Sequence, residues 1–114
     1  MSMLKLIIKR SKWLRGEDNW KSYLLRKDDK KMCCLGFLAL KSGHTNKEVL
    51  NIQIPSEIQK DNKFPHNIIK NGRCTKTCFS LMGVNDDGNI DEAKREYKLT
   101  KLFKRINIRA QFVD

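Results

Sequence analysis

The sequence has little of what membrane proteins and most enzymes require. Its 114 residues include no apolar run near the roughly 20 residues that a membrane-spanning helix needs. Residues 4–8 are too short and too interrupted for a signal peptide, so we expect the protein to stay in the cytosol. The six glycines are scattered and form no phosphate-binding loop. The two histidines, His44 and His66, lie in no recognisable catalytic motif, so we predict no enzymatic activity.

Acidic residues are scarce at both ends of the chain. Residues 1–15 carry five Lys or Arg and no acid, and residues 93–109 carry seven against Glu96 alone. These segments account for the net charge of +11, because the rest of the chain is balanced. Charge concentrated in this way predicts an anionic partner. The alternative is that the lysines only keep a small protein soluble.

The most apolar stretch lies at residues 32–42 and contains the adjacent pair Cys33 and Cys34. A helix that is apolar on nearly every side must lie in the middle of a small domain. Gly43 follows it, where helices commonly end in a left-handed glycine. With 39% hydrophobic residues, the chain suits a single domain, 1–114. We predict an α+β fold, mainly helical, with one or two short β-hairpins around this central helix.

Two elements are expected before the central helix. Residues 3–15 mix apolar and basic positions in the pattern of a helix, with Lys5, Lys9 and Lys12 on one side. Residues 22–26 are short and apolar in their centre, which favours a strand.

After the central helix, polar residues mark two short helical pieces. Thr45 and Glu48 have the spacing of a capping box, which predicts a helix over 46–50. Pro55 is tolerated at the first position of a helix and is expected to start another helical turn.

The clearest hairpin signal lies at residues 68–75. Its centre is Asn71-Gly72, a pair that accepts positive φ at both positions of a tight turn. Residues 79–84 are then expected to form a short helix, closed by a loop at 85–88.

The last helix is the best-defined element. Asn89 and Glu92 can cap its start. One apolar stripe follows helical spacing and comprises Leu99, Leu102, Phe103 and Ile106. A second, purely basic stripe comprises Lys94, Lys98, Lys101 and Arg105. Residues 106–112 then alternate in polarity with the period of a strand.

The basic stripe is the best candidate for a functional surface. Cations at one-turn spacing can contact successive phosphates, and lysine-rich contacts read backbone or shape rather than base sequence. The candidate nucleic-acid-binding residues are Lys94, Lys98, Lys101, Arg105, Lys5, Lys9 and Lys12. The alternative interpretation of the stripe is a solvated helix face.

The four cysteines raise the question of zinc. Cys74 and Cys78, with His66 or one of Cys33 and Cys34, could supply ligands. Adjacent cysteines on a helix point about 100° apart, however, which disfavours a shared metal. A disulfide is not expected in the cytosol. We therefore expect buried apolar cysteines and no cofactor, with zinc as the alternative.

Residues 85–92 resemble a calcium loop in composition. Aligning Gly88 with the obligatory glycine of such a loop puts Gly83 at the first ligand position and Lys94 at the last. Neither residue has the required carboxylate, so a turn before a helix is expected instead.

The motif Cys-Cys-Leu-Gly at 33–36 resembles the signature of a family of small phage-encoded proteins of unassigned function. Three further segments agree in order with that family, at 13–16, 54–58 and 81–86. The similarity covers about residues 10–106, and the chain departs from it in the basic segment 59–78 and in its more basic last helix. The resemblance implies a phage origin and an intracellular setting, not a chemistry.

These observations predict a small, basic, non-enzymatic phage accessory protein of the host cytoplasm. We expect it to bind a nucleic acid or ribonucleoprotein of the host, and an anti-defence role of the anti-CRISPR kind follows by analogy with small phage proteins. The alternatives are a module that docks on an acidic protein surface and a zinc-stabilised small protein.

Overall fold

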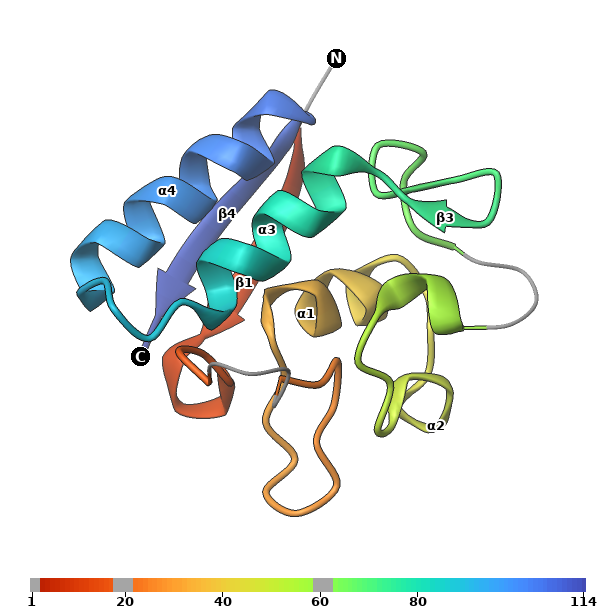
Figure 1. Cartoon of the computed structure of the whole chain (residues 1–114), viewed down its shortest axis with the longest axis horizontal. Helices are drawn as coiled ribbons and strands as arrows, with labels where there is room; N and C mark the ends of the chain where they lie inside the picture. The colour runs from red at the N-terminus through yellow and green to blue at the C-terminus, as the bar shows by residue number, and fades with distance from the viewer. Residues whose placement is uncertain (1–2, 18–21, 59–62) are drawn as a thin grey trace.

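The computed structural model describes residues 3–17, 22–58 and 63–114. Its main parts are three helices and a two-stranded sheet: α1 (Cys34–Lys41), α3 (Lys76–Asp86), α4 (Glu92–Arg105), β1 (Leu4–Lys9) and β4 (Ile108–Val113). Helix α4 packs against β4 and α1 against β1, while α3 contacts both of these helices (Figure 1). The predicted α+β class is confirmed.

The sheet joins two distant segments in parallel. Leu4 of β1 is in register with Ile108 of β4, and Lys9 with Val113. Alternate side chains of both strands, such as Leu6 and Ile8, are buried against the helices. The prediction of a helix over 3–15 is therefore wrong. Residues 4–9 form a strand and Arg10–Lys12 a short 3-10 helix (η1), because pairing with β4 buries every second residue.

Helix α1 is the centre of the core, as predicted, but it starts later than residue 32. Met32 instead forms a parallel β-bridge with Trp13, and Cys33 occupies the N-cap. Leu35 and Leu38 are fully buried. Gly43, with φ of 111°, ends the helix as expected.

The predicted capping box is present at α2 (Asn46–Val49), where Thr45 and Glu48 bond each other's backbone. The proline-led turn forms the 3-10 helix η2 (Pro55–Glu57). Residues 22–26 are not a strand, since Leu25 forms only an isolated bridge with Leu50.

The predicted hairpin is confirmed as β2 (Ile69–Lys70) and β3 (Arg73–Cys74). Asn71 and Gly72 both take positive φ, 53° and 76°, as a tight primed turn requires. Helix α3 is longer at both ends than the predicted 79–84. It reaches Asp86 because Asn85, expected in a loop, lies in its last turn and is fully buried.

Asn85 is the polar centre of the core. Its side-chain oxygen accepts hydrogen bonds from the indole N–H of Trp13 and from the backbone N–H of Cys34, at 2.8 and 3.0 Å. Its side-chain amide donates to the carbonyl of Leu14 at 3.0 Å. One amide therefore joins the segment after β1, the start of α1 and the end of α3.

The longest of the described helices is α4, with 14 residues. Among the described residues, no helix has both the length and the apolar character needed to cross a membrane.

Candidate functional site

Helix α4 carries the candidate site and is fixed at its start by Asp91. The carboxylate of Asp91 accepts a hydrogen bond from the backbone N–H of Lys94 at 2.8 Å. The sequence suggested Asn89 and Glu92 as caps. Asp91 takes this place because its extended backbone, just before the first helical residue, suits an N-cap. Leu99 and Phe103 are fully buried beneath the helix, which turns the opposite side outward.

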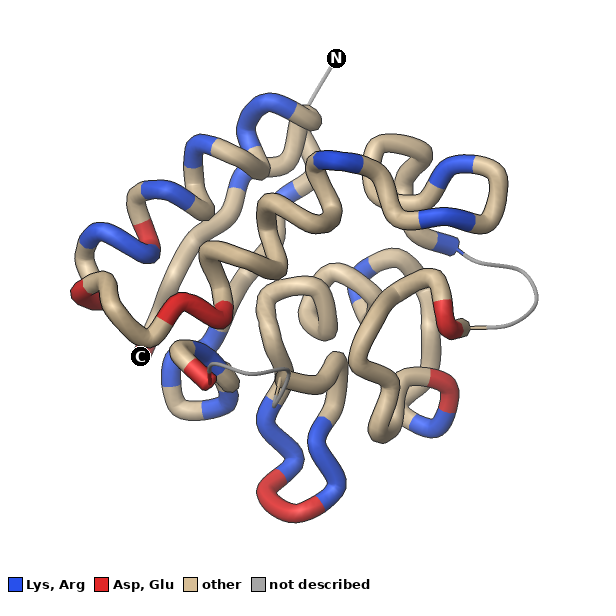
Figure 2. Tube along the Cα trace, in the orientation of Figure 1, with Lys and Arg blue, Asp and Glu red and all other residues tan. Residues whose placement is uncertain are grey.

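The outward side of α4 is a continuous row of exposed cations. All four residues of the predicted basic stripe are exposed, and Lys104 joins them. We call this set the basic face; it comprises Lys94, Lys98, Lys101, Lys104 and Arg105. None of its members forms an ion pair within the described ranges. Figure 2 shows basic positions following one another along α4.

The acids of α4 are engaged away from the basic face. Glu96 accepts two hydrogen bonds from the guanidinium of Arg10, each 2.8 Å long. Glu92 pairs with Arg15 at 2.5 Å and also with the buried Arg95. Both carboxylates therefore neutralise the positive charge of arginines, on the side of α4 that faces η1 and the segment after it. Neither carboxylate forms an ion pair with a residue of the basic face.

A shallow groove of about 270 Å³ runs between α3 and α4 beside the basic face. Val84 of α3 and the half-buried Leu102 of α4 give it apolar lining, and Ser80 adds a hydroxyl. Its other lining residues belong to the basic face: Lys98, Lys101 and Arg105. The groove thus places apolar surface next to cations.

An aromatic ring lies within the basic face. Tyr97 is 60% exposed, the highest value among the large hydrophobic side chains described. The ammonium of Lys101 sits 4.9 Å from the centroid of its ring, one helical turn away. Tyr97 and Lys104 were not among the residues predicted from the sequence. The signal was available, since both fall on the polar side of a helix whose apolar stripe was recognised.

The amino-terminal lysines of the predicted set belong to a different surface. Lys5 and Lys9 are exposed on the face of the sheet opposite to the helices, where Lys5 lies beside Arg109 of β4. Because α4 packs on the other face, the sheet separates these lysines from the basic face. Lys12 is exposed on η1. The seven predicted residues therefore do not share one surface.

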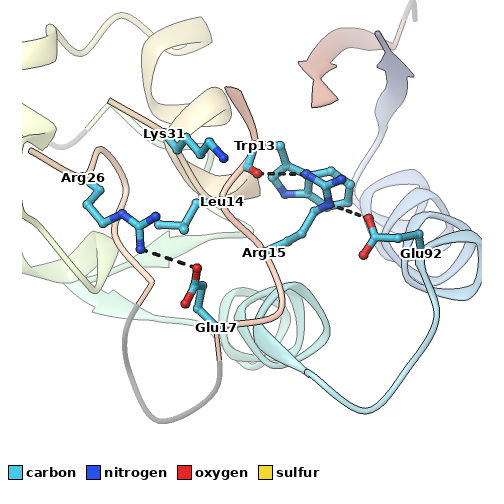
Figure 3. Close-up of a pocket in the computed structure, with 7 residues that line it drawn as sticks. All are labelled: Trp13, Leu14, Arg15, Glu17, Arg26, Lys31 and Glu92. Atoms are coloured by element: carbon cyan, nitrogen blue, oxygen red, sulfur yellow. Dashed lines mark hydrogen bonds and ion pairs between the residues drawn. The ribbon is translucent and has the colours of Figure 1, made fainter. Parts of the chain in front are cut away.

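A second group of charged residues surrounds a polar pocket near Trp13 (Figure 3). Arg15 stacks over the ring of Trp13, with its guanidinium 4.5 Å from the centroid, and pairs with Glu92. Arg26 lies 3.5 Å from Glu17. The cations of this pocket are thus largely neutralised by its own acids. An incoming anion would have to displace a carboxylate here, which it need not do on the basic face.

The cysteines are mostly enclosed. Cys33, Cys34 and Cys78 are buried and Cys74 is half-buried, and all four are free thiols. Burial raises the pKa of Cys33 to about 12 and that of Cys34 well above its ordinary value. Within the described ranges, no three or more His, Cys, Asp or Glu side chains are grouped so that they could hold a metal ion. The zinc alternative built on Cys74 and Cys78 therefore gains no geometric support.

Comparison with known proteins gives no further guide to the site, since no family model, curated protein or solved structure matches the chain.

Proposed function

We propose that this protein is a non-enzymatic nucleic-acid-binding protein that uses the basic face of α4 to contact phosphates. The observation that carries the proposal is the separation of charge on one helix. Its acids pair with arginines of the amino-terminal segment, and within the described residues none of its exposed cations forms an ion pair. The field of such a row attracts polyanions and raises their association rate.

The dimensions of the basic face suit a phosphate backbone. From Lys94 to Arg105 the helix advances roughly 16 Å, at about 1.5 Å per residue. Nucleic acids present phosphates along their length at spacings that several cations over this distance can meet together. The side chains are mostly lysines, which bind phosphate as point charges and carry little information about base sequence. Binding that depends on salt and tolerates many sequences is expected.

The resemblance of the Cys33–Cys34 motif to small phage proteins supports a wider proposal. The nucleic acid would then belong to the host, free or within a ribonucleoprotein of the host cytoplasm. A basic protein that covers such a complex would act as an accessory, anti-defence factor, as anti-CRISPR inhibitors do. The binding proposal does not depend on this origin.

The test of the proposal is fluorescence anisotropy with labelled DNA and RNA of several sequences at increasing salt. We expect the logarithm of the binding constant to fall linearly with the logarithm of salt concentration, with similar slopes for unrelated sequences. If no DNA or RNA binds with a Kd below about 100 micromolar at near-physiological salt, the weak end of the usual range for nonspecific binding, the proposal is wrong.

The rival function is docking on an acidic protein surface, which the same charges favour. A competition separates the two. The protein is first isolated together with any acidic host protein that co-purifies with it. Free nucleic acid added to this complex should release the protein partner if the basic face binds phosphates. Retention of the partner at saturating nucleic acid favours the rival.

A further inference from the structure

The basic face is more than a row of cations, because it also contains apolar and aromatic surface open to solvent. Tyr97 stands among the lysines with 60% of its surface exposed. On the side of the basic face that is turned toward α3, the groove is lined by Val84 and Leu102. A surface that contacts only the backbone of a duplex has no use for either feature, since a duplex stacks its bases inside and presents phosphates and groove edges.

Single strands differ from duplexes in the surface that they offer. Their bases are unpaired and can lie on aromatic rings, while their phosphates follow a basic groove. The basic face has both parts within one stretch of helix. Its cations surround Tyr97 at one-turn spacing, and three of them border the apolar groove: Lys98, Lys101 and Arg105.

We propose that the ligand of the basic face is single-stranded nucleic acid, with phosphates on the lysines and bases on Tyr97 and in the groove between α3 and α4. This inference rests on the proposed function and narrows its ligand class. Because the face is positively charged, its ligand should be negatively charged. The apolar lining and the exposed ring favour a polyanion whose bases are accessible.

The ring of Tyr97 has a cation over one of its faces, which leaves the other face for a base. The ammonium of Lys101 lies 4.9 Å from the ring centroid, which restrains the ring by a cation–π contact. The same ammonium can contact the phosphate next to a stacked base. Ring and cation are therefore presented together by residues one turn apart on α4.

The chain offers a matched control for this ring. Phe79 is also exposed, at 52%, and also lies on a helix. It precedes Ser80 on α3, and its side chain points about 100° away from that of the groove residue Ser80. Loss of this ring removes an exposed aromatic of similar size without changing the groove lining.

The experiment compares three ligands of one length by fluorescence anisotropy at fixed salt: an intact single strand, the same strand in a duplex, and an abasic strand. Each ligand is made as DNA, and the first two are also made as RNA, so that binding of single-stranded DNA can be compared with binding of single-stranded RNA. We expect the intact single strand to bind tighter than the duplex. The abasic strand keeps its phosphates but should bind about tenfold more weakly, because stacking is lost.

Substitutions at Tyr97 and Phe79 show which aromatic ring contacts the bases. Tyr97→Ala should weaken binding of the intact single strand by about tenfold and leave the abasic strand unchanged, whereas Tyr97→Phe should retain binding. Phe79→Ala should match the unaltered protein with every ligand. Circular dichroism checks that each variant is folded.

Two results would overturn the inference and leave the proposed function open. Equal binding of intact and abasic strands, or intact-strand binding that is indifferent to Tyr97→Ala, means that bases are not contacted. In that case the proposed function still stands if binding falls with salt as phosphate contacts require. Failure of every strand and duplex to bind removes the proposed function and this inference together.

Discussion

The indole N–H of Trp13 donates a 2.8 Å hydrogen bond to the side-chain oxygen of Asn85 inside the core. The same oxygen accepts the first backbone N–H of α1, from Cys34. Both donors are buried, so water cannot replace the amide if it is lost. A polar residue placed in this way fixes how three segments meet.

Asn85→Ala should therefore destabilise the protein strongly. It leaves two buried donors and the carbonyl of Leu14 without their partner, and each orphaned group costs about 1–3 kcal/mol. We expect a loss of roughly 3–5 kcal/mol in the free energy of unfolding, measured by urea denaturation with circular dichroism. The control Asn89→Ala removes an exposed amide and should change stability by less than about 0.5 kcal/mol. A loss below about 1 kcal/mol for Asn85→Ala would contradict the described network.

Two helical glycines should respond to alanine in opposite ways. A Cβ on Gly36 would lie 1.9 Å from the carbonyl oxygen of Leu24, a backbone atom that cannot move aside freely. Gly36→Ala should cost about 3 kcal/mol or more, or prevent folding. A Cβ on the exposed Gly83 of α3 meets nothing within 4 Å. Gly83→Ala should stabilise the protein by about 0.5–1 kcal/mol, because alanine suits a helix better.

Thermal melts of the two variants decide the matter. Gly83→Ala should raise Tm by a few degrees and Gly36→Ala should lower it. Similar behaviour of the two glycines would mean that α1 does not approach residue 24 as closely as described.

Removal of single cations from the basic face should change the salt dependence of nucleic-acid binding and leave the folded structure intact. Lys98→Ala, Lys101→Ala and Arg105→Ala should each reduce the slope of log K against log salt by about 0.7–0.9, the contribution of one phosphate contact. The effect should be alike for unrelated sequences. Lys47→Ala, an exposed lysine on α2, is the matched control and should leave the slope unchanged. If the three variants and the control all gave the same slope of log K against log salt, the basic face would not be the surface that contacts phosphates.

The thiols should differ in reactivity as their burial differs. The thiolate is the reactive form, and Cys33, with a pKa of about 12, is deprotonated to roughly one part in ten thousand at pH 8. Cys34 and Cys78 are also buried, with raised pKa values. Iodoacetamide should therefore modify Cys74 first in the native protein. Mass spectrometry of peptides taken at successive times shows the order in which the thiols react. All four thiols should react together in urea, and early labelling of Cys33 in the native state would contradict the enclosed core.

The sequence predicted best those elements whose signals are local. The hairpin at Asn71-Gly72, the capping box of α2 and the two faces of α4 depend on residues within a few positions of one another. Each is present in the structure. The exposed part of the candidate site was predictable for the same reason, because helical spacing alone turns the stripe outward.

Elements that depend on distant partners were not predictable. Residues 4–9 are mixed apolar and basic, a composition that suits a helix as well as a strand, and only β4 decides between them. Asn85 reads as a loop residue because its partners, Trp13 and Cys34, lie far away in sequence. The separation of Lys5 and Lys9 from the basic face follows from the same sheet. The groove between α3 and α4 likewise needs the packing of two helices.

The parallel pairing of β1 with β4 also orders events in time. The strand β1 can pair with β4 only after the roughly one hundred residues that separate Leu4 from Ile108 have been synthesised. Contacts of such long sequence separation slow folding, because the intervening chain must be gathered before they form. Until then Leu6 and Ile8 lack their neighbours on β4, and a nascent molecule must carry them partly exposed. The growing chain is therefore expected to depend on chaperones or on speed of translation more than a helical bundle of equal length would.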